Sequence, residues 1–350
     1  MAVRGGARFR RLAPERQLAV DLGTANTVVY QRGRGVIAFE PSVVAIDERT
    51  GDVYAVGEEA RRMIGRTPAH IKATRPLRHG VIADFETTEH MLRYFIRSAV
   101  RRLGGGAEVM VCIPSGVTQV ERTAVEEATI GAGAARAYLI EEPLAAAIGA
   151  GLPVAESIGS FVLDVGGGTS EMAVTALGGM VVSHSVRVGG YDLDEAIVKL
   201  LQDRHRLLIG QEQAERVKLD IGAARPQRIE PAVTEVAGRD LSTGLLRRAS
   251  VDSEEVVAAL QRPLDQILEG LELVLERTPP ELAGDIADRG VMLVGGGALL
   301  RDFDELIRAR TGLAVTTTDD PLITVAVGAG MALENAHSLT PARRRRRRRF

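Results

Sequence analysis

A short apolar strand that ends in an aspartate and a glycine turn occurs twice in this chain of 350 residues. The first copy is Asp21-Leu22-Gly23-Thr24, and the second, whose aspartate lies 143 positions further on, is Asp164-Val165-Gly166-Gly167-Gly168-Thr169. After each copy the sequence repeats one order of strand, glycine turn and strand. Such an internal repeat predicts two domains of similar topology, each carrying one copy of the turn.

Both turns are suited to phosphate. Glycines allow backbone N–H groups to approach phosphate oxygens closely, and the carboxylate of each turn can organise a hydrated divalent cation. Two such turns, one from each domain, could therefore hold one polyphosphate from opposite sides.

The bulk composition agrees with two soluble domains of roughly 150–200 residues. Apolar residues make up 45% of the chain and aromatic residues only 3%, so the cores must be built mainly from aliphatic side chains. Cys112 is the single cysteine, which excludes a disulfide framework and suits a reducing compartment. We find no apolar run of about 18 residues and no signal-peptide pattern, so we expect a cytosolic protein.

Charge is distributed unevenly along the chain. The net charge is −2, but Arg343 to Arg349 are seven consecutive arginines, and without those seven positive charges the net charge is −9. The first sixteen residues are also basic. We therefore expect an acidic body with two cationic ends.

The periodicity of apolar residues predicts alternating strands and helices. We expect strands at 27–31, 36–39, 109–113, 171–176, 180–188 and 291–294, and helices at 86–102, 118–132, 192–201, 211–223, 253–276 and from the glycines at 295–297 through 310. Asp192, with Glu195 three residues later, is expected to cap the third of these helices. This alternation is typical of an α/β fold with largely parallel sheets in two lobes.

The predicted domain plan has five parts. They are a flexible basic arm (1–16), a first lobe (17–146) with a small subdomain at about 35–74, a second lobe (147–318) with a small subdomain at about 189–250, a C-terminal helical segment that returns to the first lobe (319–338), and a disordered arginine tail (339–350).

Three further local features are candidates for the same site. Pro143 at a first helical position would place the Glu142 carboxylate at a helix start, where it could orient a water for phosphoanhydride hydrolysis. A base or ribose could lie against the bare backbone of the glycine triplet 295–297. The set Glu212, Glu215 and Lys218 shares one helical face. Each feature also has a simpler interpretation: an acid favoured by the helix dipole, a tight turn, and a solvated Glu215–Lys218 ion pair.

Taken together, these residues resemble the superfamily of ATPases that includes actin, sugar kinases and heat-shock chaperones, and within it the MreB family of bacterial actins. The resemblance covers about residues 17–335. Its collinear blocks include DLGTANTVVY (21–30), IEEPLAAAIGAGLPV (140–154), DVGGGTSEMAV (164–174) and DRGVMLVGGGALL (288–300). It implies a two-lobed actin-like fold with duplicated RNase H-like core domains and a nucleotide cleft between them.

The resemblance also implies roles at the matching positions. The first phosphate loop would be Asp21, Gly23, Thr24, Ala25 and Asn26, and the second Asp164, Gly166, Gly167, Gly168 and Thr169. Asp21 and Asp164 would reach Mg²⁺ through its waters, while Glu142 would position the attacking water with help from the Thr169 hydroxyl. Gly295, Gly296, Gly297 and Ala298 match the adenosine motif, and Glu212, Glu215 and Lys218 lie where the family contacts the ribose and base.

The function implied by the resemblance is that of a slow ATPase, with ATP or ADP and Mg²⁺ as cofactors, whose copies form filaments on the inner face of the cell membrane. Such filaments organise cell-wall synthesis and cell shape, or sporulation, together with membrane-embedded elongation or sporulation proteins. The arginine tail has three interpretations: an inert end, a nucleic-acid site, or an attachment to anionic lipid. We favour lipid, because each cation near such a surface contributes roughly 1 kcal/mol.

Two rival functions share the same phosphate clamp. A metabolic kinase of the superfamily would need a catalytic acid and a substrate-binding insertion between the lobes, and we find neither in the sequence. A heat-shock-type chaperone would need a substrate-binding domain after the ATPase, where only about fifteen residues follow Asn335.

Overall fold

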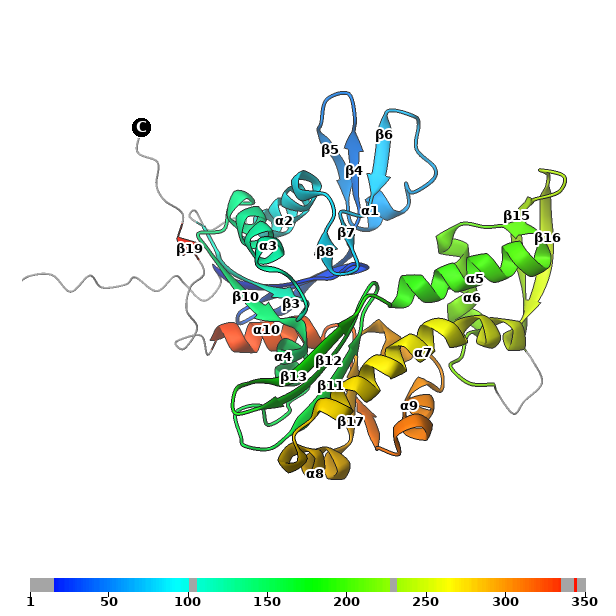
Figure 1. The fold of residues 1–350 in the computed structure, drawn as a ribbon. Coiled ribbons are helices and arrows are strands. Elements are labelled where there is room, and N and C mark those ends of the chain that lie inside the picture. The colour runs from blue at the N-terminus through cyan, green and yellow to red at the C-terminus, as the bar shows by residue number, and fades with distance from the viewer. Residues whose placement is uncertain (1–15, 101–105, 227–231, 335–342, 345–350) are drawn as a thin grey trace, which may run out of the picture.

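The computed structural model describes residues 16–100, 106–226, 232–334 and 343–344, and the structural statements below concern these residues. Figure 1 shows two lobes, each built on a sheet with helices packed against it. Residues 1–15 of the predicted basic arm (1–16), most of the arginine tail and the end of the helix expected at 86–102 lie outside the described residues.

The sheet of the first lobe has the strand order β19-β10-β9-β1-β2-β3. Its strands are β1 (Gln17–Leu22), β2 (Asn26–Gln31), β3 (Gly35–Pro41), β9 (Glu108–Ile113), β10 (Arg136–Glu141) and β19 (Arg343–Arg344). The first three strands form an antiparallel meander, and β9 then joins β1 in parallel, followed by β10. All six residues of β9 are buried, as expected for a parallel strand covered on both faces.

The second lobe repeats this arrangement in the order β13-β12-β11-β17-β18. Its strands are β11 (Ser160–Val165), β12 (Ser170–Ala176), β13 (Gly179–Val186), β17 (Val291–Val294) and β18 (Val315–Thr317). Again an antiparallel meander is joined by two parallel strands, and both meanders have a register shift between their second and third strands. The repeat predicted from the two aspartate turns is therefore present in the topology.

Helices cover both sheets. In the first lobe these are α2 (Phe85–Val100) and α3 (Gln119–Gly131), and in the second α7 (Ser253–Arg277), α8 (Pro280–Arg289) and α9 (Phe303–Thr311). Thr118 caps α3 with a full capping box to Glu121, and the Asp252 side chain caps α7. Each cap satisfies backbone N–H groups that have no partner inside the helix, so the local sequence determines where these helices begin.

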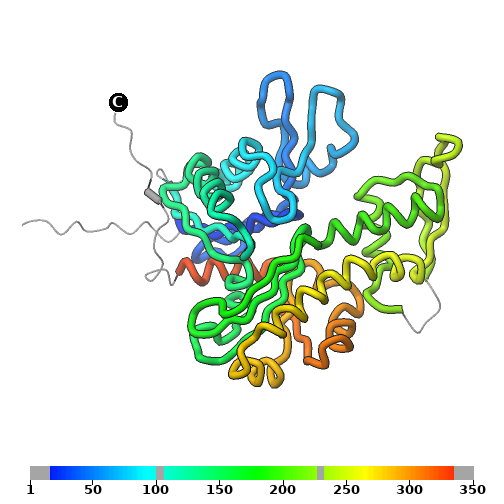
Figure 2. Tube along the Cα trace, in the orientation of Figure 1, coloured from blue at the N-terminus to red at the C-terminus, as the bar shows by residue number. Residues whose placement is uncertain are grey.

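A small subdomain projects from each lobe, and Figure 2 shows the two as separate extensions of the chain trace. The first contains β4 (Val44–Asp47), β5 (Val53–Val56), β6 (Ile71–Thr74) and α1 (Glu58–Arg61), and is followed by the hairpin β7 (Leu77–Arg78) and β8 (Val81–Ile82). The second contains α5 (Gly190–His205), α6 (Gln211–Ile221), β14 (Leu207–Leu208), β15 (Val233–Asp240) and β16 (Leu246–Asp252).

Two helices pack between the sheets of the two lobes, α4 (Glu142–Gly149) and α10 (Thr324–Glu334). Their side chains form one buried cluster with residues of both sheets, among them Met110 of β9 and Val162 of β11. The helices cross at glycines: a Cβ on Gly328 would overlap the carbonyl oxygen of Ala145, and one on Gly149 would overlap that of Thr324. Only glycine allows the two backbones to approach this closely.

The structure differs from the sequence expectations at several element boundaries. The lobe boundary expected after residue 146 falls inside α4. The single helix expected after the second glycine triplet is divided into a 3₁₀ helix, η2 (Gly296–Leu299), and α9, because Asp302, the last of the three residues between them, adopts a left-handed conformation (φ 59°). Asp192 was expected as the N-cap of its helix but occupies the third helical position, and its side chain accepts from Gly189 N.

The arginine tail differs at two residues. We expected no regular structure in 339–350, yet Arg343 and Arg344 form β19, which pairs antiparallel with Arg136 and Ala137 of β10. Without β19, β10 would be the edge of the sheet, and an edge strand offers unpaired backbone groups to an extended segment whatever its side chains are. The other residues of the tail lie outside the described part of the chain.

Candidate nucleotide-binding cleft

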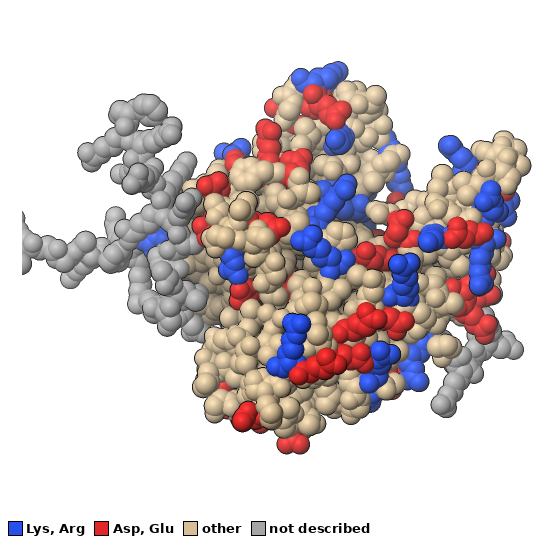
Figure 3. Space-filling model, viewed as in Figure 1, with Lys and Arg blue, Asp and Glu red and all other residues tan. Residues whose placement is uncertain are grey.

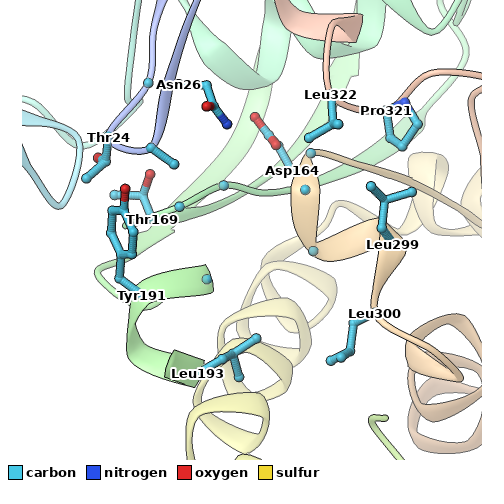
Figure 4. Close-up of a pocket in the computed structure, with 18 of the residues that line it drawn as sticks. Thr24, Asn26, Asp164, Thr169, Tyr191, Leu193, Leu299, Leu300, Pro321 and Leu322 are labelled. Carbon is cyan, nitrogen blue, oxygen red and sulfur yellow. The ribbon is translucent and has the colours of Figure 1, made fainter. Parts of the chain in front are cut away.

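A cavity of about 440 Å³ lies between the lobes and takes its walls from both of them. This volume is within the usual range for small-molecule sites. Figure 4 shows its wall residues converging from the two aspartate turns, from the start of α5 and from the segment after β17.

The two aspartate turns face each other across this cavity. From the first turn, Asp21, Gly23, Thr24, Ala25 and Asn26 line it, and from the second Asp164, Gly166, Gly167 and Thr169. The second turn is closed by a hydrogen bond from Gly166 N to Thr169 O, 2.9 Å. The structure thus brings together in one cavity nine of the ten residues predicted for the two phosphate loops.

The tips of the two turns touch. A Cβ on Gly167 would lie 2.5 Å from Ala25 Cβ, and one on Gly168 would lie 2.9 Å from Thr24 Oγ1. Gly168 is the predicted loop residue that does not line the cavity; its carbonyl oxygen lies 3.0 Å from His79 Nδ1 instead. Because the contact leaves no room for a side chain, the glycines of the second turn set how closely the lobes approach each other.

Three carboxyl groups gather at this end of the cavity. Burial raises the pKa of Asp21 to about 7, and burial followed by the charges of Asp21 and Glu171 raises the pKa of Asp164 to about 8. Burial, and then the charges of Glu171, Asp21 and Asp164, raises the pKa of Glu142 well above its usual value. In the described part of the chain no basic side chain pairs with any of the three, so the cluster is suited to a ligand that brings positive charge.

The described residues do not form a complete metal site by themselves. Within the described ranges no group of three or more His, Cys, Asp or Glu side chains is placed to hold a metal ion. Asp21 of the first lobe and Asp164 of the second nevertheless line one cavity, and both carboxyl groups carry the penalty of burial. This donor set fits a hydrated cation that takes its remaining ligands from water and phosphate.

Glu142 lies at the start of α4, as predicted, and its side chain lines the cavity although it is only 8% exposed. The helix begins at Glu142 itself, so Pro143 occupies the second helical position and not the first. The neighbouring Glu141 points elsewhere and pairs with Arg122 of α3. Glu142 is therefore the glutamate of this pair that can reach a ligand in the cleft.

The glycine triplet lies beside the second turn, since a Cβ on Gly295 would overlap the Asp164 carboxylate. Gly295, Gly296 and Gly297 line the cavity as predicted, whereas Ala298 packs against the core of the second lobe. Sequence reasoning missed the apolar part of the lining, to which Leu219, Leu299, Leu300, Pro321 and Leu322 contribute. Figure 4 shows the last four grouped at one side of the site. The adjacency of Leu299 and Leu300 to the glycine triplet was the only available signal for this apolar lining.

The prediction for α6 is partly wrong. Glu215 and Lys218 line the cavity, but Glu212 does not: it pairs with Arg66 of the first lobe (2.8 Å) and with Arg216 (2.9 Å). The alternative of a Glu215–Lys218 ion pair is also wrong. Lys218 Nζ lies 2.7 Å from Asp194 Oδ1 on α5 and donates to Gly190 O, because the packing of α5 against α6 brings a buried carboxylate closer than Glu215.

The fold and this cleft define an actin-like protein, and comparison of structures agrees. MreB5 of Spiroplasma citri bound to ADP matches with a TM-score of 0.86 and 35% identity, covering 91% of this chain and 96% of that one. The same protein bound to AMPPNP matches with a TM-score of 0.85. The MamK double helical filament shares the fold at 23% identity, with a TM-score of 0.77.

Comparison of sequences defines the family. The model of the family described as MreB/Mbl protein matches residues 15–341. The cell shape-determining protein MreB of Escherichia coli (strain K12) is 50% identical over 323 residues, which cover 91% of this chain and 93% of that protein. The cell shape-determining protein Mbl of Bacillus subtilis (strain 168) is 43% identical over 325 residues, 93% and 97% of the two chains. The chain belongs to the MreB/Mbl family of bacterial actin homologues.

Proposed function

We propose that this chain is a slow ATPase of the bacterial cytoskeleton that binds ATP with Mg²⁺ between its lobes and assembles head-to-tail into filaments. One observation carries the proposal: the two aspartate turns, one from each lobe, meet in a single cavity. A polyphosphate held by both turns favours one angle between the lobes, and loss of its terminal phosphate removes part of that preference. The nucleotides named for MreB5 of Spiroplasma citri, ADP and AMPPNP, support this ligand class.

We assign the residues of the cleft separate roles in ATP binding and hydrolysis. Asp21 and Asp164 hold Mg²⁺ through its waters, and the cation neutralises charge on the phosphates. Glu142 orients a water toward the terminal phosphorus, and the Thr169 hydroxyl, which also lines the cavity, assists it. The base and ribose lie between the glycine triplet 295–297 and the apolar part of the lining, within reach of Glu215 and Lys218. Glu212 does not line the cavity, so it contributes only indirectly, as a neighbour of Glu215 and Lys218 on α6.

We further propose that the filaments lie on the inner face of the cell membrane and organise cell-wall synthesis and cell shape, or sporulation, with membrane-embedded partners. The names of the relatives, cell shape-determining proteins MreB and Mbl, support the cellular role. In the described part of the chain, no helix is both long and apolar enough to cross a bilayer. We assign attachment to the arginine run 343–349, whose positive charges suit anionic lipid. Replacing the run with lysines should preserve liposome binding, and deleting it should weaken binding.

Sedimentation tests the central proposal. Purified protein should pellet as polymer with ATP and Mg²⁺, and less with ADP or without nucleotide. Omitting Mg²⁺ by chelation should reduce both ATP binding and pelleting, since the carboxyl groups of Asp21 and Asp164 would then face the phosphates without a cation. Equal pelleting under all these conditions would refute a nucleotide-dependent filament.

A substitution tests the assignment of Glu142. Glu142→Ala should slow phosphate release about 100-fold, the usual size of a lost acid–base or water-orienting group, while ATP-dependent assembly persists. Glu141→Ala is the matched control, because the adjacent carboxylate pairs with Arg122 and does not line the cavity. A normal rate of hydrolysis in Glu142→Ala would remove this residue from its proposed role.

A further inference from the structure

One buried carboxylate near the cleft has no role in the function proposed so far. Glu171 lies on β12, is 1% exposed, and does not line the cavity. Its Oε2 accepts hydrogen bonds from Ser115 N (3.0 Å) and Ser115 Oγ (2.6 Å), and its Oε1 accepts one from Ser185 Oγ. Ser115 belongs to the first lobe and Glu171 to the second, so this carboxylate connects the lobes.

The position of Glu171 relates it to the second aspartate turn. In the antiparallel pair of β11 and β12, Glu171 lies directly opposite Asp164, so the two side chains project from the same face of the sheet. Thr169 precedes Glu171 by two residues, the period at which side chains of an extended chain return to one side. Glu171 thus lies directly beyond the turn that faces the cavity.

The position of Ser115 relates it to Glu142. In the parallel pair of β9 and β10, Ile113 lies beside Glu141, so Ser115 and Glu142 both follow the ends of neighbouring strands. The segment that holds Ser115 also packs on the second lobe, since a Cβ on Gly116 would lie 3.3 Å from Ser185 Cβ. The Glu171 carboxylate therefore joins the second turn to the part of the first lobe that carries Glu142.

The energetics favour this connection only when the lobes are close. A buried carboxylate is costly unless donors satisfy it, and hydrogen bonds to an ionised group are about twice as strong as neutral ones. The described residues offer Glu171 two serine hydroxyls and one backbone N–H, of which the Ser115 pair comes from the other lobe. Separation of the lobes would remove two of these three bonds and leave the carboxylate partly unsatisfied.

We propose that Glu171 is a positioning residue for hydrolysis: through Ser115 it holds Glu142 in place against the second phosphate turn. The inference rests on the proposed function, because it assigns Glu171 to the reaction of the same cleft. Glu171 itself does not line the cavity, so it acts on the rate of hydrolysis and leaves the affinity for ATP nearly unchanged. Its partner Ser185 fixes the carboxylate from the side of its own lobe.

The test compares single-turnover phosphate release with the affinity for a fluorescent ATP analogue, in the full chain with Mg²⁺. Glu171→Ala should slow release about 10- to 100-fold, the cost of misplacing a reacting group by about 1 Å, and change affinity less than about twofold. Ser115→Ala, which keeps the backbone donor, should slow release several-fold. Ser183→Ala is the control, because Ser183 lies on the same strand as Ser185 and does not bond to Glu171.

The variant Glu171→Gln distinguishes the effect of the hydrogen bonds of Glu171 from the effect of its negative charge. In Glu171→Gln the amide oxygen can accept from Ser115 and the amide N–H can donate to Ser185 Oγ, so release should stay within about threefold of wild type. Glu171→Gln as slow as Glu171→Ala would overturn the proposal in favour of a role for the negative charge. Wild-type rates in both Glu171→Ala and Ser115→Ala would overturn it as well, as would a fall in affinity equal to the fall in rate.

Failure of the underlying function gives a different result. A wild-type chain that binds no ATP analogue refutes the proposed function, whereas a wild-type chain that hydrolyses ATP at the same rate as every variant refutes only the role of Glu171. If Glu171→Ala does not fold, as judged by circular dichroism, the other two variants still decide the matter, because Ser115→Ala should slow release several-fold while Glu171→Gln should stay close to wild type.

Discussion

The contacts between the two lobes differ in kind between the inner and the outer end of the cleft. At the inner end, around the phosphate turns and the crossing of α4 with α10, backbones lie against each other: Gly328 packs on Ala145, and Gly167 on Ala25. At the outer end, between the two small subdomains, the contacts are made by long charged side chains such as Arg66, whose guanidinium lies 2.8 Å from Glu212. On the face drawn in Figure 3, basic and acidic side chains are interspersed across this boundary.

The outer contacts vary in strength. Arg66 and Glu212 are 61% and 52% exposed, and Arg61 lies 4.0 Å from Glu215, so both pairs are screened by solvent. Arg75 is better placed: its Nε donates to Tyr191 OH at 2.9 Å, and its guanidinium lies over the Tyr191 ring at 4.7 Å. The outer end thus depends on a few polar contacts, of which Arg75 makes the least exposed.

This difference indicates how the molecule moves. Close backbone packing resists sliding, because any shift forces overlap, while exposed ion pairs break and re-form at little cost. We therefore infer that the lobes rotate about the inner end and that the cleft opens between the small subdomains. Four predictions test this comparison, from the largest expected effect to the smallest.

The largest effect is expected at the helix crossing. Gly328→Ala should destabilise the protein by about 3 kcal/mol, the upper end for overpacking, because the new Cβ would overlap Ala145 O and the backbone there cannot retreat. Chemical denaturation measures this change. Gly284→Ala on α8 is the control with the opposite sign: its Cβ would meet nothing within 4 Å, so it should stabilise by about 0.5–1 kcal/mol. Similar effects of both substitutions would contradict the tight crossing.

The next effect concerns the buried pair at the base of the outer end, Asp194 and Lys218. Burial raises the pKa of Asp194 from 3.8 to about 6, although the nearby charge of Lys218 lowers it. Because the folded state binds this proton more tightly, the contribution of Asp194 to stability is complete below pH 3.8 and is lost as pH rises through about 6. The loss amounts to about 3 kcal/mol, at 1.36 kcal/mol for each pKa unit.

Denaturation curves between pH 3.5 and 7.5 check this pH dependence. Asp194→Asn should lose less stability than wild type as the pH rises, since the amide does not ionise. Asp203→Asn, at an exposed position of the same helix, is the control and should follow wild type. If the curves of wild type and Asp194→Asn run parallel, Asp194 does not titrate as described.

A smaller effect is expected where the turns touch. Gly167→Ala should weaken binding of a fluorescent ATP analogue about 10-fold, because its Cβ would press on Ala25 and separate the two phosphate turns. Gly179→Ala, at the first residue of β13, is the control, since its Cβ would meet nothing within 4 Å. Equal affinity in Gly167→Ala and wild type would show that the turns need not touch for binding.

The smallest effect is expected at the outer surface. Arg66→Ala should speed dissociation of the ATP analogue less than about fivefold, because an exposed ion pair contributes at most about 1 kcal/mol. Added salt should speed dissociation from wild type and change the variant less. Arg62→Ala is the control, because Arg62 pairs with Glu58 inside its own lobe. A larger effect for Arg66 than for Gly328 or Gly167 would reverse the comparison.

Much of the fold could be predicted from the sequence because its signals are local. An apolar run before Asp21 and another before Asp164 indicate buried strands, and the glycines after them indicate turns. The repeat of this order was enough to predict two sheets with one topology, and the structure has them. Helix starts with a side-chain cap, such as that of α3 at Thr118, were also predictable.

The errors at the site have long-range causes. The helical spacing of α6 is visible in the sequence at Glu212, Glu215 and Lys218. The ion pair of Lys218 with Asp194 forms only because α6 packs against α5. The ion pair of Glu212 with Arg66 forms only because the first lobe lies close to α6. Likewise Ala298 follows the glycine triplet in sequence, yet the short 3₁₀ helix there turns it into the core of the second lobe.

The sequence by itself determined that two aspartate–glycine turns exist, that each ends a buried strand, and that Glu142 begins a helix. Only the tertiary structure decided that the turns touch, that leucines from separate segments line the cavity, and that Glu171 joins the lobes through Ser115. The physical reason is that glycine turns and helix starts depend on neighbours along the chain. Contacts such as Glu171 with Ser115, 56 positions apart, exist only after both lobes have folded and packed.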